Sequence, residues 1–175
     1  MERTVQQVQM AEIVVVENSH LLKTTLGSCV GIVLYDEIRR VTGLAHIMLP
    51  RKLDRDSSIG KYADTALPAI VQRVLERGVS QDRITARIAG GANMFRTATD
   101  RGIATIGEQN IAAVKELLEG LKIPVVFEDV GGEHGRTVVF DNETGRIEVK
   151  TLRKVLAPDP QSNGRGSTRQ EGRHE

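Results

Sequence analysis

Runs of β-branched and apolar residues in the first third of the chain predict short strands. Four such runs come before Pro50, at residues 12–16, 21–25, 30–35 and 41–49. Only the short charged segment 36–40 separates the last two runs. We therefore expect these two runs to form an antiparallel hairpin.

Two later segments carry apolar residues at helical spacing. The first set ends before Gly78 and comprises Tyr62, Ala66, Ala69, Ile70, Val74 and Leu75. Pro68 lies inside this pattern, so the helix either bends there or begins nearby. The second set ends at Gly120, which predicts the helix stop, and comprises Ile111, Val114, Leu117 and Leu118.

Further strands are predicted at residues 84–89, 125–130, 137–140 and 147–152. Glycines separate several of them, and Gly90-Gly91 is interpreted as a tight turn without a catalytic role. Together the elements predict a layered α/β domain with mostly antiparallel strands and two main helices. We place this domain at residues 12–157, after an N-terminal extension at 1–11 and before a polar, disordered tail at 158–175.

Composition and charge narrow the classes of function. The 175 residues include 39% hydrophobic but only 3% aromatic residues, which predicts one aliphatic core. The formal net charge of +1 provides no global field for nucleic acid or an anionic membrane. No apolar run is long enough to span a bilayer, and the polar N-terminus lacks a secretory signal, so we expect a cytoplasmic protein.

The chain has a single cysteine, Cys29, so no internal disulfide or multi-cysteine zinc site is expected. His20, His134 and His174 provide no closely spaced ligand pair, so no metal site is predicted either. Cys29 begins the first strand of the predicted hairpin and His46 lies late in the second. The hairpin therefore brings the thiol and the imidazole to the same end of the sheet.

A thiol beside an imidazole could hydrolyse a carboxamide, because the imidazole raises the thiolate fraction and then protonates the departing ammonia. Gly27 and Ser28 form a flexible turn before Cys29, and the backbone amides of Ser28 or Cys29 could bind the oxyanion. The alternative is a purely structural pair. A lone cysteine beside an apolar strand is commonly a small buried hydrophobe, and a lone histidine is commonly a hydrogen-bonded core residue.

Four motifs, in this order and spacing, closely resemble CheD, the bacterial chemoreceptor glutamine deamidase family. They are Thr25-Leu26-Gly27-Ser28-Cys29-Val30, Gly43-Leu44-Ala45-His46-Ile47-Met48-Leu49-Pro50, Lys61-Tyr62-Ala63-Asp64 and Gly90-Gly91-Ala92-Asn93-Met94-Phe95. Later segments at 129–136 and 145–150 also fit. The resemblance therefore extends over roughly residues 12–152.

The resemblance implies a layered α/β/β fold similar to that of bacterial toxin deamidases, with Cys29 as nucleophile and His46 as its histidine. The third catalytic residue of the family is a threonine a few positions before the cysteine. Here Lys23 occupies that position, so we expect Thr24 or Thr25 to take the role. Neighbouring strand residues face opposite sides, so the strand register decides between them.

The resemblance further implies that the substrates are methyl-accepting chemotaxis receptors, that no cofactor is needed, and that the response-regulator phosphatase CheC is a second partner. Two other functions remain open from the residues. One is a binding module that regulates CheC or the receptors and has an incidental thiol. The other is a different thiol hydrolase, such as a thioesterase.

Overall fold

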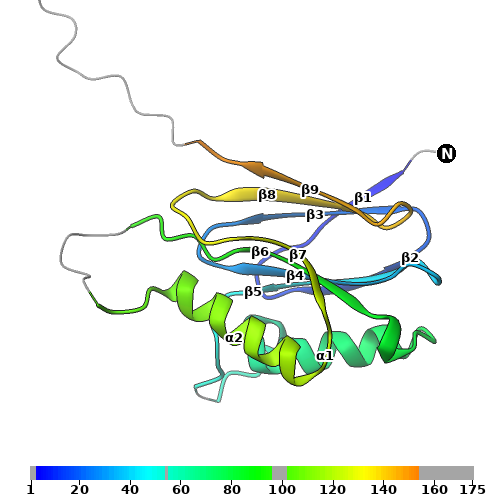
Figure 1. The fold of residues 1–175 in the computed structure, drawn as a ribbon, viewed down its shortest axis with the longest axis horizontal. Helices are drawn as coiled ribbons and strands as arrows, with labels where there is room; N and C mark the ends of the chain where they lie inside the picture. Colours follow the sequence, from blue (N-terminus) through cyan, green and yellow to red (C-terminus); the bar gives the residue numbers. More distant parts are fainter. Residues whose placement is uncertain (1–2, 54, 96–101, 154–175) are drawn as a thin grey trace, which may run out of the picture.

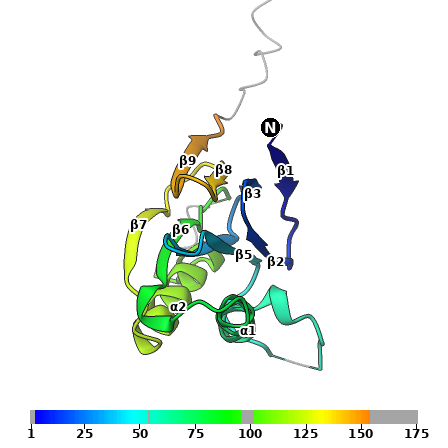
Figure 2. The same ribbon diagram turned by 90° about the vertical axis from the view of Figure 1, so that its right-hand side faces the viewer.

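The computed structural model describes residues 3–53, 55–95 and 102–153, which form three stacked layers (Figures 1 and 2). Two helices form the first layer, a five-stranded inner sheet the second and a four-stranded outer sheet the third. The predicted α/β/β architecture with mostly antiparallel strands and two main helices is confirmed.

The inner sheet has the strand order β2-β5-β4-β6-β7. Its members are β2 (Ile13–Glu17), β4 (Val30–Asp36), β5 (Val41–Ile47), β6 (Thr85–Gly90) and β7 (Val125–Val130). The predicted hairpin is confirmed, because β4 and β5 pair antiparallel from Val30 opposite Ile47 to Asp36 opposite Val41. Every residue of both strands is buried, as expected for strands covered on both faces.

The outer sheet has the strand order β1-β3-β8-β9. Its members are β1 (Thr4–Gln7), β3 (His20–Leu26), β8 (Arg136–Asp141) and β9 (Arg146–Thr151). Buried and partly exposed residues alternate along β8, since only one face of this sheet packs on the inner sheet. Leu22 and Phe140 on that face contact the inner-sheet residues Val33 and Leu44 in one apolar cluster.

The helices α1 (Ala63–Leu75) and α2 (Ile106–Gly120) cover the other face of the inner sheet (Figure 2). α1 continues through Pro68, and α2 ends at Gly120 as predicted. α2 begins with a capping box in which Thr105 and Glu108 bond each other's backbone N–H. The described residues also form two short 3-10 helices, η1 (Ile59–Lys61) and η2 (Gln81–Arg83). Among the described residues, no helix is long and apolar enough to cross a membrane.

The aliphatic core predicted from the composition lies between the helices and the inner sheet. Its fully buried members include Ile32, Leu34, Ile47, Leu67, Ile70, Ile88 and Leu118. Gly43 in β5 permits the close approach of α1, since a Cβ there would lie 2.7 Å from the Cγ1 atom of Ile70. The helix layer and the strands that carry the candidate site are thus packed directly together.

The N-terminal segment belongs to the folded structure more closely than its sequence indicates. We set residues 1–11 apart as an extension, but residues 4–7 form β1, which pairs parallel with β3. The following residue, Val8, is 1% exposed and its N–H donates to the carbonyl of Lys23. β1 escaped prediction because it has four residues and is mostly exposed, so it lacks an apolar period. The predicted tail at 158–175 lies outside the described residues.

Candidate active site

The β4–β5 hairpin determines how Cys29 and His46 lie relative to each other. Gly31 of β4 pairs with His46 of β5, and Cys29 precedes Gly31 by two residues. Cys29 itself lies just before β4, and it packs against Ala89, the residue that pairs with Gly31 from the other neighbouring strand, and against Leu26 and Val138 of the outer sheet, so Cys29 and His46 share the face that meets the outer sheet. The thiol and the imidazole therefore lie at the same end of the β4–β5 hairpin, as predicted.

Gly31 leaves space on this face for the outer sheet. A Cβ at Gly31 would lie 3.0 Å from a methyl group of Leu26 and 3.7 Å from that of Thr24, both in β3. The face shared with His46 is therefore the one that packs against the outer sheet. The missing side chain allows β3 to approach His46 closely.

Thr24 links the two sheets through a hydrogen bond to the His46 ring. The Thr24 Oγ1 atom lies 2.8 Å from the His46 Nδ1 atom and 2.8 Å from the carbonyl oxygen of Val8. A carbonyl only accepts, so the single hydroxyl proton of Thr24 is donated to Val8. The Thr24 oxygen then accepts from His46, which places the imidazole proton on Nδ1. The other ring nitrogen, Nε2, is left with a free lone pair.

The Nε2 lone pair lies in buried surroundings. His46 is 3% exposed, and its Nε2 atom is buried without a hydrogen-bond partner in the described structure. Burial lowers the pKa of His46 below its ordinary value of 6.5, against smaller opposing effects of the Val8 carbonyl and the Glu12 charge. The imidazole is therefore neutral at pH 7 and available as a base.

Cys29 has a partly apolar environment. The thiol packs against a small cluster formed by Leu26, Ala89 and Val138. Burial raises the pKa of the Cys29 thiol above its ordinary value of 9.0, and its own backbone N–H lowers the pKa by a smaller amount. With the pKa of the thiol raised and that of His46 lowered, both groups are uncharged at rest near pH 7. A nucleophilic attack by this thiol would therefore require a base to take its proton.

Backbone hydrogen bonds hold the turn before Cys29 against the end of β6. Gly91 N–H donates to the Cys29 carbonyl at 2.8 Å, and Ala92 N–H donates to the Gly27 carbonyl at 2.9 Å. Gly90 adopts a φ of +106°, and a Cβ there would lie 2.2 Å from the Cys29 oxygen. Only glycine fits this conformation and this contact, which is why the predicted tight turn contains glycines.

The structure separates the two threonine candidates. Thr24 is buried and contacts His46, whereas Thr25 points to the exposed face of the outer sheet. There the Thr25 Oγ1 atom lies 3.3 Å from the Thr137 Oγ1 atom. Lys23 is also on this outer side, beside Val139. Of the two residues, Thr24 is the one that the fold brings to the histidine.

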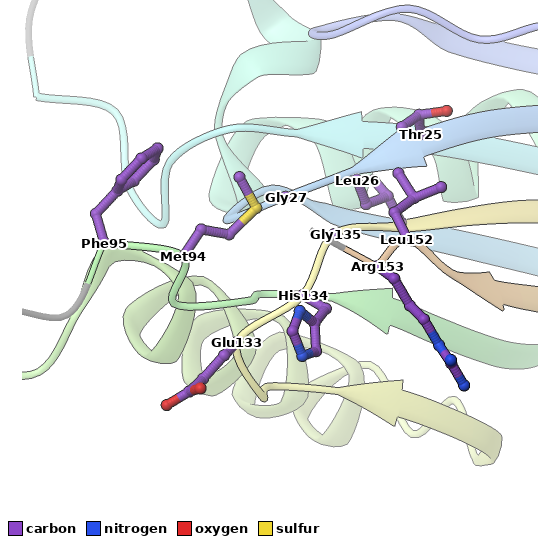
Figure 3. A pocket seen from close by; sticks show the side chains of 10 residues that line it. All are labelled: Thr25, Leu26, Gly27, Met94, Phe95, Glu133, His134, Gly135, Leu152 and Arg153. Atoms are coloured by element: carbon purple, nitrogen blue, oxygen red, sulfur yellow. The ribbon is translucent and has the colours of Figure 1, made fainter. Parts of the chain in front are cut away.

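Two hollows flank the Gly27-Ser28 turn. The first, with a volume of about 360 Å³, is mostly apolar, and Figure 3 shows Met94 reaching toward Gly27 and the side chains of Glu133 and Arg153 at its border. The second, about 500 Å³, lies on the other side of Met94 and includes Ser28. Met94 and Phe95 line both, and Phe95 is 82% exposed. The turn before Cys29 thus has an open hollow on each side.

Sequence reasoning missed three residues that build this site. They are Val8, which accepts the Thr24 proton, Gly31, which makes space beside His46, and Asn110, which donates to the carbonyls of Ser28 and Met48. Asn110 could have been noticed in the sequence, because it is a polar residue one turn before Val114 in the apolar stripe of its helix. The described residues contain no cluster of three metal-binding side chains.

Comparison with known proteins assigns the chain to a family. Residues 48–151, more than half of the chain, match the family model described as "CheD chemotactic sensory transduction". A solved structure of a hypothetical protein, YfiH from Bacillus licheniformis, matches with a TM-score of 0.44 and 16% identity, over 67% of this chain and 49% of that one.

Relatives matched over most of their length have the same family name. The "probable chemoreceptor glutamine deamidase CheD" of Caldanaerobacter subterraneus subsp. tengcongensis is 45% identical over 87% of this chain and 96% of its own. The "chemoreceptor glutamine deamidase CheD" of Halalkalibacterium halodurans is 43% identical over 83% of this chain and 93% of its own. With this identity and coverage, and with the family-model match, the chain belongs to the CheD family.

Proposed function

We propose that this protein hydrolyses the side-chain amide of glutamine residues in methyl-accepting chemotaxis receptors and leaves glutamate. The observation that carries the proposal is the Thr24–His46–Val8 chain of hydrogen bonds, which leaves the His46 Nε2 atom free on the face shared with Cys29. The names of the relatives supply the class of substrate.

The first half of the reaction forms a thioester. His46 Nε2 takes the proton of the Cys29 thiol as the sulfur attacks the carbonyl carbon of the glutamine side chain. The resulting oxyanion is stabilised by backbone N–H groups of the Ser28-Cys29 turn. The carbon–nitrogen bond then breaks, and the departing nitrogen takes the proton from His46 and leaves as ammonia.

The second half of the reaction releases glutamate. Water enters the position that ammonia has left, and His46 Nε2 removes one of its protons as the oxygen attacks the thioester carbon. The carbon–sulfur bond breaks, and the Cys29 sulfur regains its proton from His46. Thr24 keeps the ring oriented in both halves and stabilises the imidazolium through the Nδ1–H bond, so its role is that of a positioning residue.

The surface around the turn suits a protein substrate. Met94, Phe95, Ile103 and Ile106 are exposed apolar residues beside the two hollows. Exposed apolar residues gathered in one place are typical of protein contact sites. We propose that the receptor binds this face, that a CheC-type phosphatase binds the same face in competition, and that both encounters occur in the cytoplasm.

A direct assay tests the chemistry. Receptor cytoplasmic fragments are incubated with the wild type, Cys29→Ala, His46→Ala or His20→Ala, and ammonia release and Gln-to-Glu conversion are followed by mass spectrometry. His20→Ala is the matched control, because His20 lies in β3 and its ring hydrogen-bonds the Glu17 carbonyl and not His46. We expect activity in the wild type and His20→Ala and its loss in the other two variants.

Three outcomes would contradict the proposal. Conversion by Cys29→Ala would exclude the thiol as nucleophile. A wild type that binds receptor or CheC without releasing ammonia would indicate a binding module. The missing activity would then be explained by the pKa of the Cys29 thiol, which burial raises. Cleavage of thioesters without conversion of glutamine would indicate a different thiol hydrolase.

A further inference from the structure

Asn110 is a polar side chain enclosed in the apolar interface between α2 and the inner sheet. It is 0% exposed, and Ala113 and Val114, one turn further along the same face, are buried and apolar. Its Oδ1 atom is buried without a hydrogen-bond partner in the described structure. An unsatisfied buried oxygen destabilises a fold, so packing alone does not account for asparagine at this position.

The amide nitrogen of Asn110 connects the two segments that carry the candidate dyad. It donates to the Ser28 carbonyl at 3.0 Å and to the Met48 carbonyl at 2.9 Å, which uses both of its N–H hydrogens. Ser28 directly precedes Cys29, and Met48 follows His46 by two residues. The β4–β5 ladder ends at the pair of Val30 and Ile47. Asn110 therefore links the two backbone segments just beyond this last pair.

The bond to Ser28 also fixes the backbone N–H of Cys29. The Ser28 C=O and the Cys29 N–H belong to one planar trans peptide and point in opposite directions. When Asn110 holds the carbonyl toward α2, the N–H of Cys29 is directed away from α2. That N–H is one of the proposed oxyanion donors, and it is the group that lowers the pKa of the Cys29 thiol.

We propose that Asn110 is a positioning residue that fixes the Ser28–Cys29 peptide and thereby aims the Cys29 N–H at the sulfur and the developing oxyanion. The kinetic consequence of this role rests on the proposed deamidase function. The effect on the ionisation of the Cys29 thiol does not rest on that function, because thiol ionisation can be measured without substrate.

The test compares Asn110→Leu with Val114→Ala. Leucine has nearly the shape of asparagine but no donors, whereas Val114→Ala perturbs the same helix face and leaves the two carbonyls bonded. Three quantities are measured on each full-length protein: the urea midpoint of unfolding, the pH profile of Cys29 alkylation by iodoacetamide, and kcat and KM on receptor fragments. If Asn110→Leu does not fold, Asn110→Ser undergoes the same measurements, because serine is too short to span both carbonyls.

For the Asn110 variants we expect an alkylation profile displaced to higher pH and a roughly ten- to hundredfold lower kcat, with KM changed by less than about twofold. Val114→Ala should lower the urea midpoint and leave the alkylation profile and kcat unchanged. An alkylation profile in the Asn110 variants that matches that of Val114→Ala would overturn the inference. A displaced profile in a protein whose wild type converts no glutamine would support the positioning role and refute the deamidase function.

Discussion

The two sheets differ in how much of each strand is buried. In the inner sheet, β4 and β5 are buried at every residue, since helices cover one face and the outer sheet covers the other. In the outer sheet, β8 alternates between buried and partly exposed residues, and β9 is mostly exposed. The inner sheet thus provides the low-dielectric surroundings of His46, while the outer sheet contributes its polar partner.

This difference explains why the site lies between the layers. A neutral imidazole with a lowered pKa requires burial, which the inner sheet supplies. A fixed ring orientation requires a polar partner, which a fully apolar strand lacks. Thr24 provides this partner from the opposing sheet, and Val8 satisfies the threonine in turn. The orientation of His46 therefore depends on how well the two sheets pack.

The largest contrast is expected between apolar residues of the two sheets. Ile32 in β4 is 0% exposed, whereas Ile147 in β9 is only partly buried. Ile32→Ala leaves a cavity between closed layers and should lower the free energy of unfolding by about 2–5 kcal/mol. Ile147→Ala, at a site that water already reaches, should cost clearly less. Urea denaturation of both variants checks this, and equal losses would mean that the outer sheet is as tightly enclosed as the inner one.

A smaller contrast is expected between adjacent threonines of β3. Thr24→Val removes the buried hydroxyl that bonds Val8 and His46, which should cost about 1–3 kcal/mol of unfolding free energy. It should also lower kcat, because the imidazole loses its fixed orientation. Thr25→Val, on the exposed face, should change stability by less than about 0.5 kcal/mol and leave kcat intact. The reverse order of effects would show that Thr25 is the positioning residue.

The same contrast shows what the sequence could predict. β4 and β5 were found because strands buried on both faces give continuous apolar runs, and the charged segment 36–40 marks the hairpin. Cys29 and His46 were placed at the same end of this hairpin for the same reason. Their roles as a functional pair remain a prediction, because the resemblance and not the spacing suggested them.

The remaining features depend on contacts between layers, which a strand pattern does not contain. Thr24 and Thr25 are equivalent by type, and only the packing of β3 determines which faces the inner sheet. β1 is too short and exposed to give a signal, yet it positions the Val8 carbonyl. Asn110 reaches carbonyls 82 and 62 residues away in sequence, a distance over which no local pattern is informative.

The smallest expected effect is the pH dependence that His46 contributes to stability. Its folded-state pKa lies below the ordinary value of 6.5, since burial disfavours the imidazolium. Between the two pKa values the unfolded chain therefore binds more protons than the folded one, so the free energy of unfolding falls as pH decreases through this window. His46→Gln removes this titration, while the lowered pKa values of Asp36, Asp56 and Asp141 affect both proteins equally.

The unfolding free energy of the wild type minus that of His46→Gln should therefore be independent of pH above 6.5 and should decrease as the pH falls below 6.5. Urea titrations at several pH values check this. The acid limb of kcat/KM should also lie below pH 6.5, because the base must be neutral in the free enzyme. A limb above pH 6.5 would mean that the imidazolium is stabilised by a charge, such as a Cys29 thiolate. The resting dyad would then be an ion pair, and the enclosure of His46 between the sheets would matter for orientation alone.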